Sequence, residues 1–128
     1  MEHLTPKKTS EFLKEHPDAV FIDCRSEMEY KFVGHPLGAT LIPWNDGPKW
    51  EINPNFLTQV KKIAAIDQPV VLICRSGNRS KEAGLALEKA GFAKVYNVLN
   101  GFEGQRDEKH HRNTINGWRV DGLPWEQS

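Results

Sequence analysis

The sequence lacks the features that mark secreted, membrane-spanning or nucleic-acid-binding proteins. Two cysteines among 128 residues are too few for a disulfide framework, so a reducing, cytoplasmic location is expected. The longest uninterrupted apolar run, residues 70–74, is far too short to cross a membrane, and the first residues do not have the form of a signal peptide. The 17 Lys and Arg balance the 17 Asp and Glu, so no global field would attract nucleic acid. We therefore expect neither nucleic acid nor a membrane among the partners, and an anionic ligand would need a local site.

The composition that remains is typical of one globular domain. Apolar residues make up 38% of the chain and charged residues 27%, which is too apolar for a disordered protein. The length is close to that of a common single domain with one hydrophobic core. We therefore predict a single domain over residues 1–128.

Short apolar runs alternate along the chain with segments of helical periodicity. The predicted strands are residues 19–22, 39–42, 70–73 and 95–98. The predicted helices lie near residues 6–13, 26–31, 54–64 and 83–90. Because parallel strands need crossover connections, this alternation predicts an α/β fold with a parallel sheet and helices on both faces. Residues 43–48 are predicted to form a loop, and residues 101–116 have no predicted structure.

Cys74 is the most informative residue, because it lies where the central predicted strand ends and a helix is about to begin. Ligands of open parallel sheets bind in the crevice at the carboxyl ends of the strands. Main-chain N–H groups of the turn and of the helix N-terminus point into this crevice, and the helix dipole adds about half a positive charge. Gly77 allows the loop to curl so that successive N–H groups face inward.

Two arginines strengthen the positive field around this cysteine. Arg75 and Arg79 add permanent charges close to Cys74, and all of these groups favour the thiolate form. Cysteines in such surroundings have pKa values of roughly 3.5–7.5 instead of about 8.5. An isolated cysteine would more simply be a buried apolar residue. Here the arginines, the glycine and the position between strand and helix favour a nucleophile that attacks an anionic substrate.

The motifs of the chain resemble those of the rhodanese family over nearly the whole length. The loop Cys74-Arg75-Ser76-Gly77-Asn78-Arg79-Ser80 resembles the active-site loop of single-domain rhodaneses. Further resemblances lie in the segments Ile22-Asp23-Cys24-Arg25, Gly34-His35-Pro36-Leu37-Gly38-Ala39, Ile42-Pro43, Gly91-Phe92 and Gly122-Leu123-Pro124. Each segment alone is weak, but together they are specific for a single-domain rhodanese-like sulfurtransferase.

The resemblance implies a five-stranded, mainly parallel sheet with helices on both faces, and the activity of a thiosulfate sulfurtransferase. Cys74 would take the outer sulfur of thiosulfate, or of a small persulfide, and hold it as a persulfide. A thiol, cyanide or a sulfur-carrier protein would then accept this sulfur. By the same resemblance, Arg75 and Arg79 would bind the donor, with no metal and no cofactor. The N–H groups that would cradle the persulfide are those of Ser76, Gly77, Asn78 and Arg79.

Two other functions compete with this interpretation. Phosphatases and arsenate reductases of this fold place five residues between cysteine and arginine, whereas four separate Cys74 from Arg79. The smaller loop suits a single sulfur atom better than a tetrahedral phosphate. A sulfur carrier or interaction module with little turnover is the second alternative, and the presence of Cys74 and both arginines favours the enzyme over it.

The second cysteine and its neighbours are expected to support the site. Cys24 replaces an aliphatic residue of the family and is interpreted as a core residue at a strand end, with a resolving thiol that attacks the persulfide as the alternative. Asp23 and Arg25 are expected near the mouth of the site, as an ion pair that fixes the loop. His35 resembles a structural position of the family, so we do not expect it to act as a general base.

Several quieter residues lie near the predicted site. Trp44 follows a strand end and Phe102 replaces a glycine of the family, so either could wall the pocket. His110 and His111 are adjacent and therefore do not share a helix or strand face, so no metal site is predicted for them. Residues 105–116 are expected to form a solvated loop or a lid over the cleft.

Overall fold

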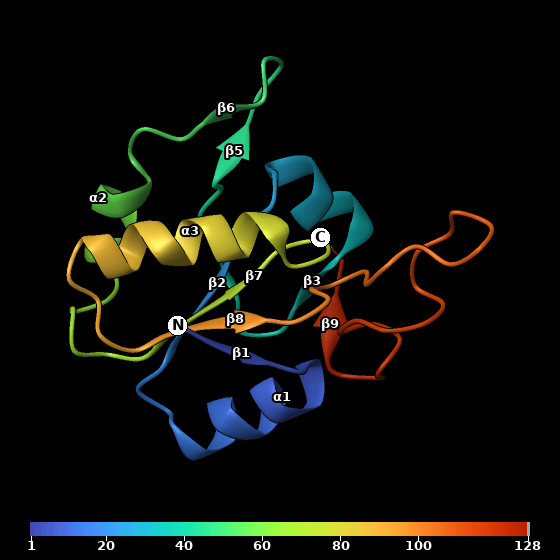
Figure 1. Cartoon of the computed structure of the whole chain (residues 1–128), viewed down its shortest axis with the longest axis horizontal. Helices are drawn as coiled ribbons and strands as arrows, with labels where there is room; N and C mark the ends of the chain where they lie inside the picture. The colour runs from blue at the N-terminus through green and yellow to red at the C-terminus, as the bar shows by residue number, and fades with distance from the viewer. Residues whose placement is uncertain (128) are drawn as a thin grey trace.

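The computed structural model describes residues 1–127 and has a five-stranded sheet in the order β1-β8-β7-β2-β4 (Figure 1). All four strand pairs of this sheet are parallel. Its strands are β1 (Glu2–Leu4), β2 (Val20–Asp23), β4 (Thr40–Leu41), β7 (Val70–Ile73) and β8 (Val95–Val98). The predicted fold class is therefore confirmed.

The central strand β7 is buried along its whole length. Val70 pairs with Val20 of β2 on one side and with Val95 of β8 on the other. All four β7 side chains are fully buried, as a parallel strand covered on both faces requires. The position of β7 places its carboxyl end, and the residue that follows it, in the middle of one edge of the sheet.

Helices cover both faces of the sheet (Figure 1). The helical elements are α1 (Pro6–Glu15), the π-helix η1 (Glu29–Val33), α2 (Phe56–Lys61) and α3 (Asn78–Lys89). Phe12 of α1 packs on a cluster that includes Phe21 and Ile73, whereas Leu87 of α3 packs on a cluster that includes Ile22. Because side chains alternate along a strand, successive residues of β2 and β7 point to opposite cores.

A side-chain cap begins helix α1, and a glycine ends helix α3. The side chain of Thr5 accepts a hydrogen bond from the N–H of Lys8, and Pro6 occupies the first helical position of α1. After α3, Gly91 has a φ of 102° and the N–H of Phe92 donates to the carbonyl of Leu87 at 3.1 Å. This contact closes the helix as its glycine predicts.

Four segments differ from the sequence prediction. The edge strand β1 was not predicted, because three residues with two exposed side chains carry no apolar signal. The expected loop at residues 43–48 contributes β5 (Asn45–Asp46), which pairs with β6 (Glu51–Ile52) as a hairpin. The helix expected over residues 54–64 begins two residues later and ends at Lys61, and Asn53 forms a turn with Asn55 and Phe56 before it. The helix expected near residues 26–31 winds mainly as η1, a π-helix.

Residues 105–116 project from the domain as an ordered loop (Figure 1, orange). The carbonyl of Glu103 accepts the N–H of Asn113, and the side chain of Asn116 exchanges two hydrogen bonds with Gln105. The chain then returns to the domain through β9 (Trp125–Glu126), which pairs with β3 (His35–Pro36). No helix within residues 1–127 is both long and apolar enough to cross a bilayer.

Candidate active site

Cys74 lies directly after β7, between the sheet and the N-terminus of α3. Its side chain is 1% exposed, yet it forms part of the wall of a pocket of about 290 Å³. The pocket is lined by Glu29, Trp50, Cys74, Arg75, Ser76, Asn78 and Arg79. The sulfur is thus sheltered from solvent but open to a small ligand. A larger hollow of about 550 Å³ beside Asp107 and Ile115 contains no part of the Cys74 loop.

The loop after Cys74 directs a main-chain donor at its sulfur. Gly77 has a φ of 108°, a conformation that favours glycine, and its N–H lies 3.0 Å from Cys74 Sγ. The hydroxyl of Ser80, one turn into α3, lies 3.2 Å from the same sulfur. A hydrogen bond from the Cys24 thiol lowers the pKa of Cys74, burial opposes it, and the donors of Ser80 and Gly77 lower it further, to about 5. Cys74 is therefore a thiolate at neutral pH.

Ser80 is itself held by a buried amide. Its hydroxyl lies 2.5 Å from Asn97 Oδ1, and Asn97 Nδ2 lies 3.1 Å from His3 Nδ1 at the sheet edge. Because a hydroxyl carries one proton, the Cys74 sulfur and Asn97 compete for it. The N–H of Gly77 is therefore the steadier donor to the thiolate, and Ser80 supplies a second that can be shared.

The two predicted arginines lie in different surroundings. Arg75 is exposed at the pocket wall, whereas Arg79 forms a bidentate ion pair with Glu29, with distances of 2.8 and 2.9 Å. Burial would raise the pKa of Glu29, but the hydrogen bonds and charge of Arg79 outweigh it and hold the pKa at about 2. The ring of Trp50 lies 5.3 Å from the same guanidinium. The positive charge of Arg79 is therefore largely balanced, and that of Arg75 is not.

Cys24 is the neighbour of Cys74 across the β2–β7 pair. Asp23 pairs in register with Ile73, so the cysteines that follow them lie side by side in the core beneath α3. The Cys24 thiol donates to the carbonyl of Ile73 at 3.3 Å, and it also lies close enough to the Cys74 sulfur to lower the pKa of Cys74. Burial above all, and then contact with Cys74, raise the pKa of Cys24 well above its ordinary value. Cys24 is thus a fully buried free thiol, as expected of a core residue at a strand end.

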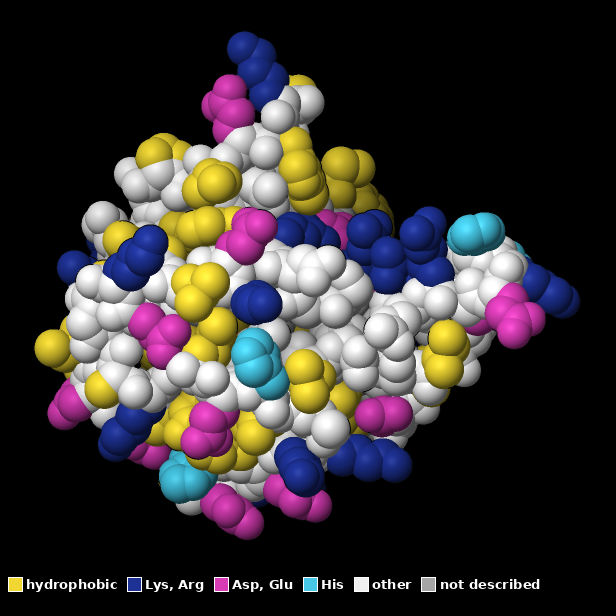
Figure 2. Space-filling view, in the orientation of Figure 1, with side chains coloured by type: hydrophobic (Ala, Val, Ile, Leu, Met, Phe, Trp, Pro, Cys, Tyr) yellow, Lys and Arg dark blue, Asp and Glu magenta, His cyan; other side chains and the backbone are white. Residues whose placement is uncertain are grey.

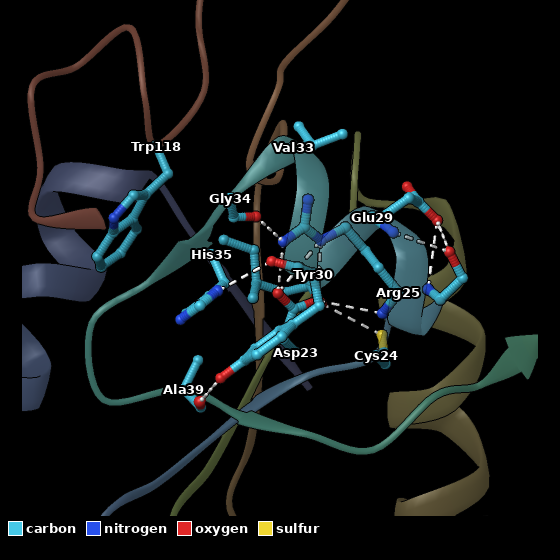
Figure 3. Close-up of polar contacts among 12 residues, drawn as sticks. Asp23, Cys24, Arg25, Glu29, Tyr30, Val33, Gly34, His35, Ala39 and Trp118 are labelled. Carbon is cyan, nitrogen blue, oxygen red and sulfur yellow. Dashed lines mark hydrogen bonds and ion pairs between the residues drawn. The ribbon is translucent and has the colours of Figure 1, made fainter. Parts of the chain in front are cut away.

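Asp23 and Arg25 form the expected ion pair, but inside the protein rather than at the mouth of the site. Arg25 Nη2 lies 2.7 Å from Asp23 Oδ2, and both side chains are fully buried. Figure 3 shows the guanidinium between this carboxylate and the carbonyl of Gly34, which it contacts at 2.5 Å. The guanidinium carbon of Arg25 lies over the ring of Phe102, 4.5 Å from the ring centroid. The pair links the end of β2 to the start of β3.

Two expectations about the pocket walls are wrong. Trp44 packs edge-on against Phe56 and donates to Glu82, so it is not part of the pocket. Phe102 is fully buried beneath Arg25. The aromatic wall is instead Trp50, which the unpredicted β5–β6 hairpin carries.

Sequence reasoning also missed the roles of Glu29 and Ser80. Ser26 and Glu29 have the spacing of a capping box, and Glu29 Oε1 accepts the N–H of Ser26 at 3.2 Å. The same carboxylate also binds Arg79, fifty positions away, which no local pattern reveals. The position of Ser80, at the end of the Cys74 loop and in the first turn of α3, is the signal that could have revealed its contact with the sulfur.

His35 has a structural position. Its ring stacks on Tyr30 at 3.8 Å, and its Nδ1 contacts the carbonyl of Tyr30 (Figure 3). Its Nε2 contacts the carboxylate of Glu126 at 3.2 Å. Within residues 1–127, no group of three His, Cys, Asp or Glu side chains is arranged to hold a metal ion.

Comparisons with known proteins agree with this architecture. The crystal structure of Rv0390 from M. tuberculosis is similar over 100% of this chain and 98% of that chain, with a TM-score of 0.90 and 38% identity. An uncharacterised protein of Rickettsia conorii is 30% identical over 98% of both sequences. The chloroplastic thiosulfate sulfurtransferase 16 of Arabidopsis thaliana is 30% identical over 81% of this chain and 77% of its own.

A sequence model of the rhodanese-like domain matches residues 5–108, which contain the whole Cys74 loop and all but the first strand of the five-stranded sheet. The chain therefore belongs to the rhodanese-like domain family.

Proposed function

We propose that the protein is a sulfurtransferase that moves a sulfane sulfur from thiosulfate, or from a small persulfide, to a thiophilic acceptor through a persulfide on Cys74. Membership of the rhodanese-like family supports sulfurtransferase activity in general, and the Arabidopsis relative is named for thiosulfate. The observation that carries the proposal is the sulfur of Cys74, which faces a pocket while the N–H of Gly77 and the hydroxyl of Ser80 point at it.

The first step begins with the Cys74 thiolate. It attacks the outer sulfur of thiosulfate, a Cys74 S–S bond forms, and the S–S bond of thiosulfate breaks as sulfite leaves with the electron pair. With a pKa of about 5, the nucleophile is already ionised at neutral pH, so this step needs no general base. In the second step an acceptor thiolate or cyanide takes the outer sulfur, and the Cys74 thiolate is restored.

The loop residues divide between donor binding and persulfide stabilisation. Arg75 lies at the pocket wall with its charge unbalanced by the described carboxylates, so it is the main group for the sulfonate oxygens of the donor. Arg79 contributes when Glu29 shares its guanidinium with the donor. The N–H groups of residues 76–79 form the cradle of the persulfide, and the Asp23–Arg25 pair holds the neighbouring strand end in place.

The test is sulfite release from thiosulfate by the wild type, Cys74→Ser and Cys24→Ser. The proposal predicts that Cys74→Ser releases no sulfite above background, because a hydroxyl at this position is not ionised at neutral pH. Cys24→Ser is the matched control and should retain the activity. Full activity of the Cys74→Ser protein would overturn the proposal.

The same preparation separates an enzyme from a carrier. If the protein is an enzyme, it turns over repeatedly when thiosulfate and cyanide are supplied together. If it is a carrier with little turnover, mass spectrometry shows one added sulfur on Cys74, while the steady-state rate stays negligible. The intact loop and the open pocket favour the enzyme.

A further inference from the structure

Three arginines form a patch that starts at the Cys74 pocket and continues along the projecting loop: Arg75, Arg106 and Arg112. We call this set the arginine patch. The carbonyl of Arg75 accepts the N–H groups of Glu103 and Gly104, and Arg112 Nη1 donates to the carbonyl of Gly104 at 2.6 Å. These bonds bring Arg112 beside Arg75. Figure 2 shows the dark blue side chains gathered between the body of the domain and the projecting loop.

The loop that carries Arg106 and Arg112 is fixed by its own contacts. The carboxylate of Asp107 accepts hydrogen bonds from the N–H groups of Lys109 and His111 and from the hydroxyl of Thr114. Gly104 is packed so closely against Asn116 that a Cβ at this position would lie 1.9 Å from its carbonyl oxygen. The backbone that carries Arg106 and Arg112 is therefore held in place before a ligand arrives.

The positive charge of the arginine patch is not neutralised locally. Within residues 1–127, none of its guanidiniums lies within 4.0 Å of a carboxylate, whereas Arg79 is paired with Glu29. Partial burial and then the charges of Arg75 and Arg106 lower the pKa of Arg112, against the opposing effect of Glu103. Arg112 thus lies in a field to which both other arginines of the patch contribute, an arrangement that favours binding of an anion with more than one negative group.

The distribution of the three arginines indicates the size of that anion. Arg75 lines the 290 Å³ pocket, and Arg106 and Arg112 do not. Thiosulfate at Cys74 can therefore use Arg75, but its oxygens do not extend to the outer pair. A ligand that uses the whole patch has its sulfur at Cys74 and further negative groups beyond the rim of the pocket.

We propose that the arginine patch is a second anion subsite that binds the carboxylates of a small thiol acceptor while its sulfur reaches the Cys74 persulfide. This inference rests on the proposed function and specifies its acceptor as a thiol that carries two or more carboxylates. Guanidiniums suit this task, since they bind carboxylates through paired N–H groups and remain charged at all relevant pH values.

The experiment follows the second half-reaction alone. The protein is loaded with thiosulfate and freed of excess donor, and loss of the persulfide is then measured with mercaptosuccinate, which has two carboxylates, and with uncharged 2-mercaptoethanol. For each protein, the rate constant with mercaptosuccinate is divided by the rate constant with 2-mercaptoethanol. This ratio is then compared between each variant and the wild type, so that the intrinsic nucleophilicity of each thiol cancels. Arg106→Gln and Arg112→Gln should each lower this ratio about two- to fivefold, the range of an exposed ion pair.

Lys109→Gln is the matched control, because it removes an exposed cation from the same loop and should leave the ratio unchanged. Succinate, which has no thiol, should slow transfer to mercaptosuccinate in the wild type and do so less in Arg106→Gln. An Arg106→Gln ratio equal to that of the wild type would overturn the subsite. Failure of the wild type to load sulfur at all would instead contradict the proposed function, so the two failures are distinguishable.

Discussion

The tripeptide Cys-Arg-Ser occurs twice in this chain, at the ends of two strands that lie side by side. Cys24-Arg25-Ser26 follows β2, and Cys74-Arg75-Ser76 follows β7. The strands are parallel and in register, so both tripeptides leave the sheet at the same edge. Nevertheless one cysteine is a buried thiol of raised pKa and the other a thiolate with a pKa of about 5.

The difference comes from the residues on either side of the tripeptides. Asp23 precedes Cys24, and its carboxylate forms a buried ion pair with Arg25. Ile73 precedes Cys74, and its uncharged side chain cannot pair with Arg75 in this way. The N–H groups of Ser26 and Glu27 donate to the carboxylates of Glu29 and Asp46, whereas after Ser76 the N–H of Gly77 points back at the Cys74 sulfur. The surroundings of the tripeptides thus differ in where the arginine lies and in whether a main-chain N–H reaches the sulfur, while burial and the contact between the two cysteines contribute most to the raised pKa of Cys24.

The largest contrast is expected between the two arginines. Arg25→Gln should destabilise the fold by about 3–5 kcal/mol, because it leaves the Asp23 carboxylate buried without its partner. Arg75→Gln should change the free energy of unfolding little, since the side chain is exposed, but should raise the KM for thiosulfate. Chemical denaturation measures the free energy of unfolding of both variants, and sulfite-release kinetics measure their KM for thiosulfate. Equal stability losses would show that the two strand ends do not differ as described.

The ionisation of Cys74 should appear in the pH dependence of stability. Its folded pKa of about 5 lies below its ordinary value near 9, so between these limits the unfolded chain binds more protons than the folded one. Stability from this group is therefore complete above pH 9 and is lost as the pH falls toward 5, with a slope of at most about 1.4 kcal/mol per pH unit. The contribution of Cys74 is obtained by subtracting the free energy of unfolding of Cys74→Ser from that of the wild type at each pH. A flat difference between pH 6 and 8 would contradict a thiolate.

The Arg79–Glu29 ion pair should determine how strongly the Arg79 guanidinium binds thiosulfate. Arg79→Ala should weaken thiosulfate binding about tenfold or more, the effect of losing a charged hydrogen-bond donor. Glu29→Gln should act in the opposite direction and lower the KM, because it frees the Arg79 guanidinium. Steady-state kinetics at constant ionic strength measure both. If Glu29→Gln raises the KM instead, the carboxylate positions Arg79 for the donor rather than competing with it.

The contact between the two cysteines should have a smaller effect. Cys24→Ala removes a donor to the Cys74 sulfur, so the pKa of Cys74 should rise by about one pH unit. Cys24→Ser keeps a donor and should stay close to the wild type. The pKa of Cys74 is measured as the midpoint of the loss of thiolate ultraviolet absorbance during an acid titration. An internal disulfide in the wild type after thiosulfate treatment, detected by mass spectrometry, would show that Cys24 resolves the persulfide.

The sequence was sufficient where a residue acts through its neighbours in the chain. The strand at residues 70–73, the caps at Thr5 and Gly91 and the turn at Gly77 follow from local patterns, and these elements place Cys74. The contacts that cross the fold were not predictable in this way. The ion pair of Glu29 with Arg79 depends on a π-helix, and the position of Trp50 depends on a hairpin whose two strands have two residues each. Elements this short have no clear pattern in the sequence.

The most direct test of the account is the pH dependence of alkylation at each cysteine by iodoacetamide, with peptide mass spectrometry to identify the modified residue. The account predicts that Cys74 of the folded protein reacts with a midpoint of about pH 5, while Cys24 remains unmodified until the protein unfolds. A midpoint for Cys74 near that of a free thiol, or modification of Cys24 before Cys74, would contradict it.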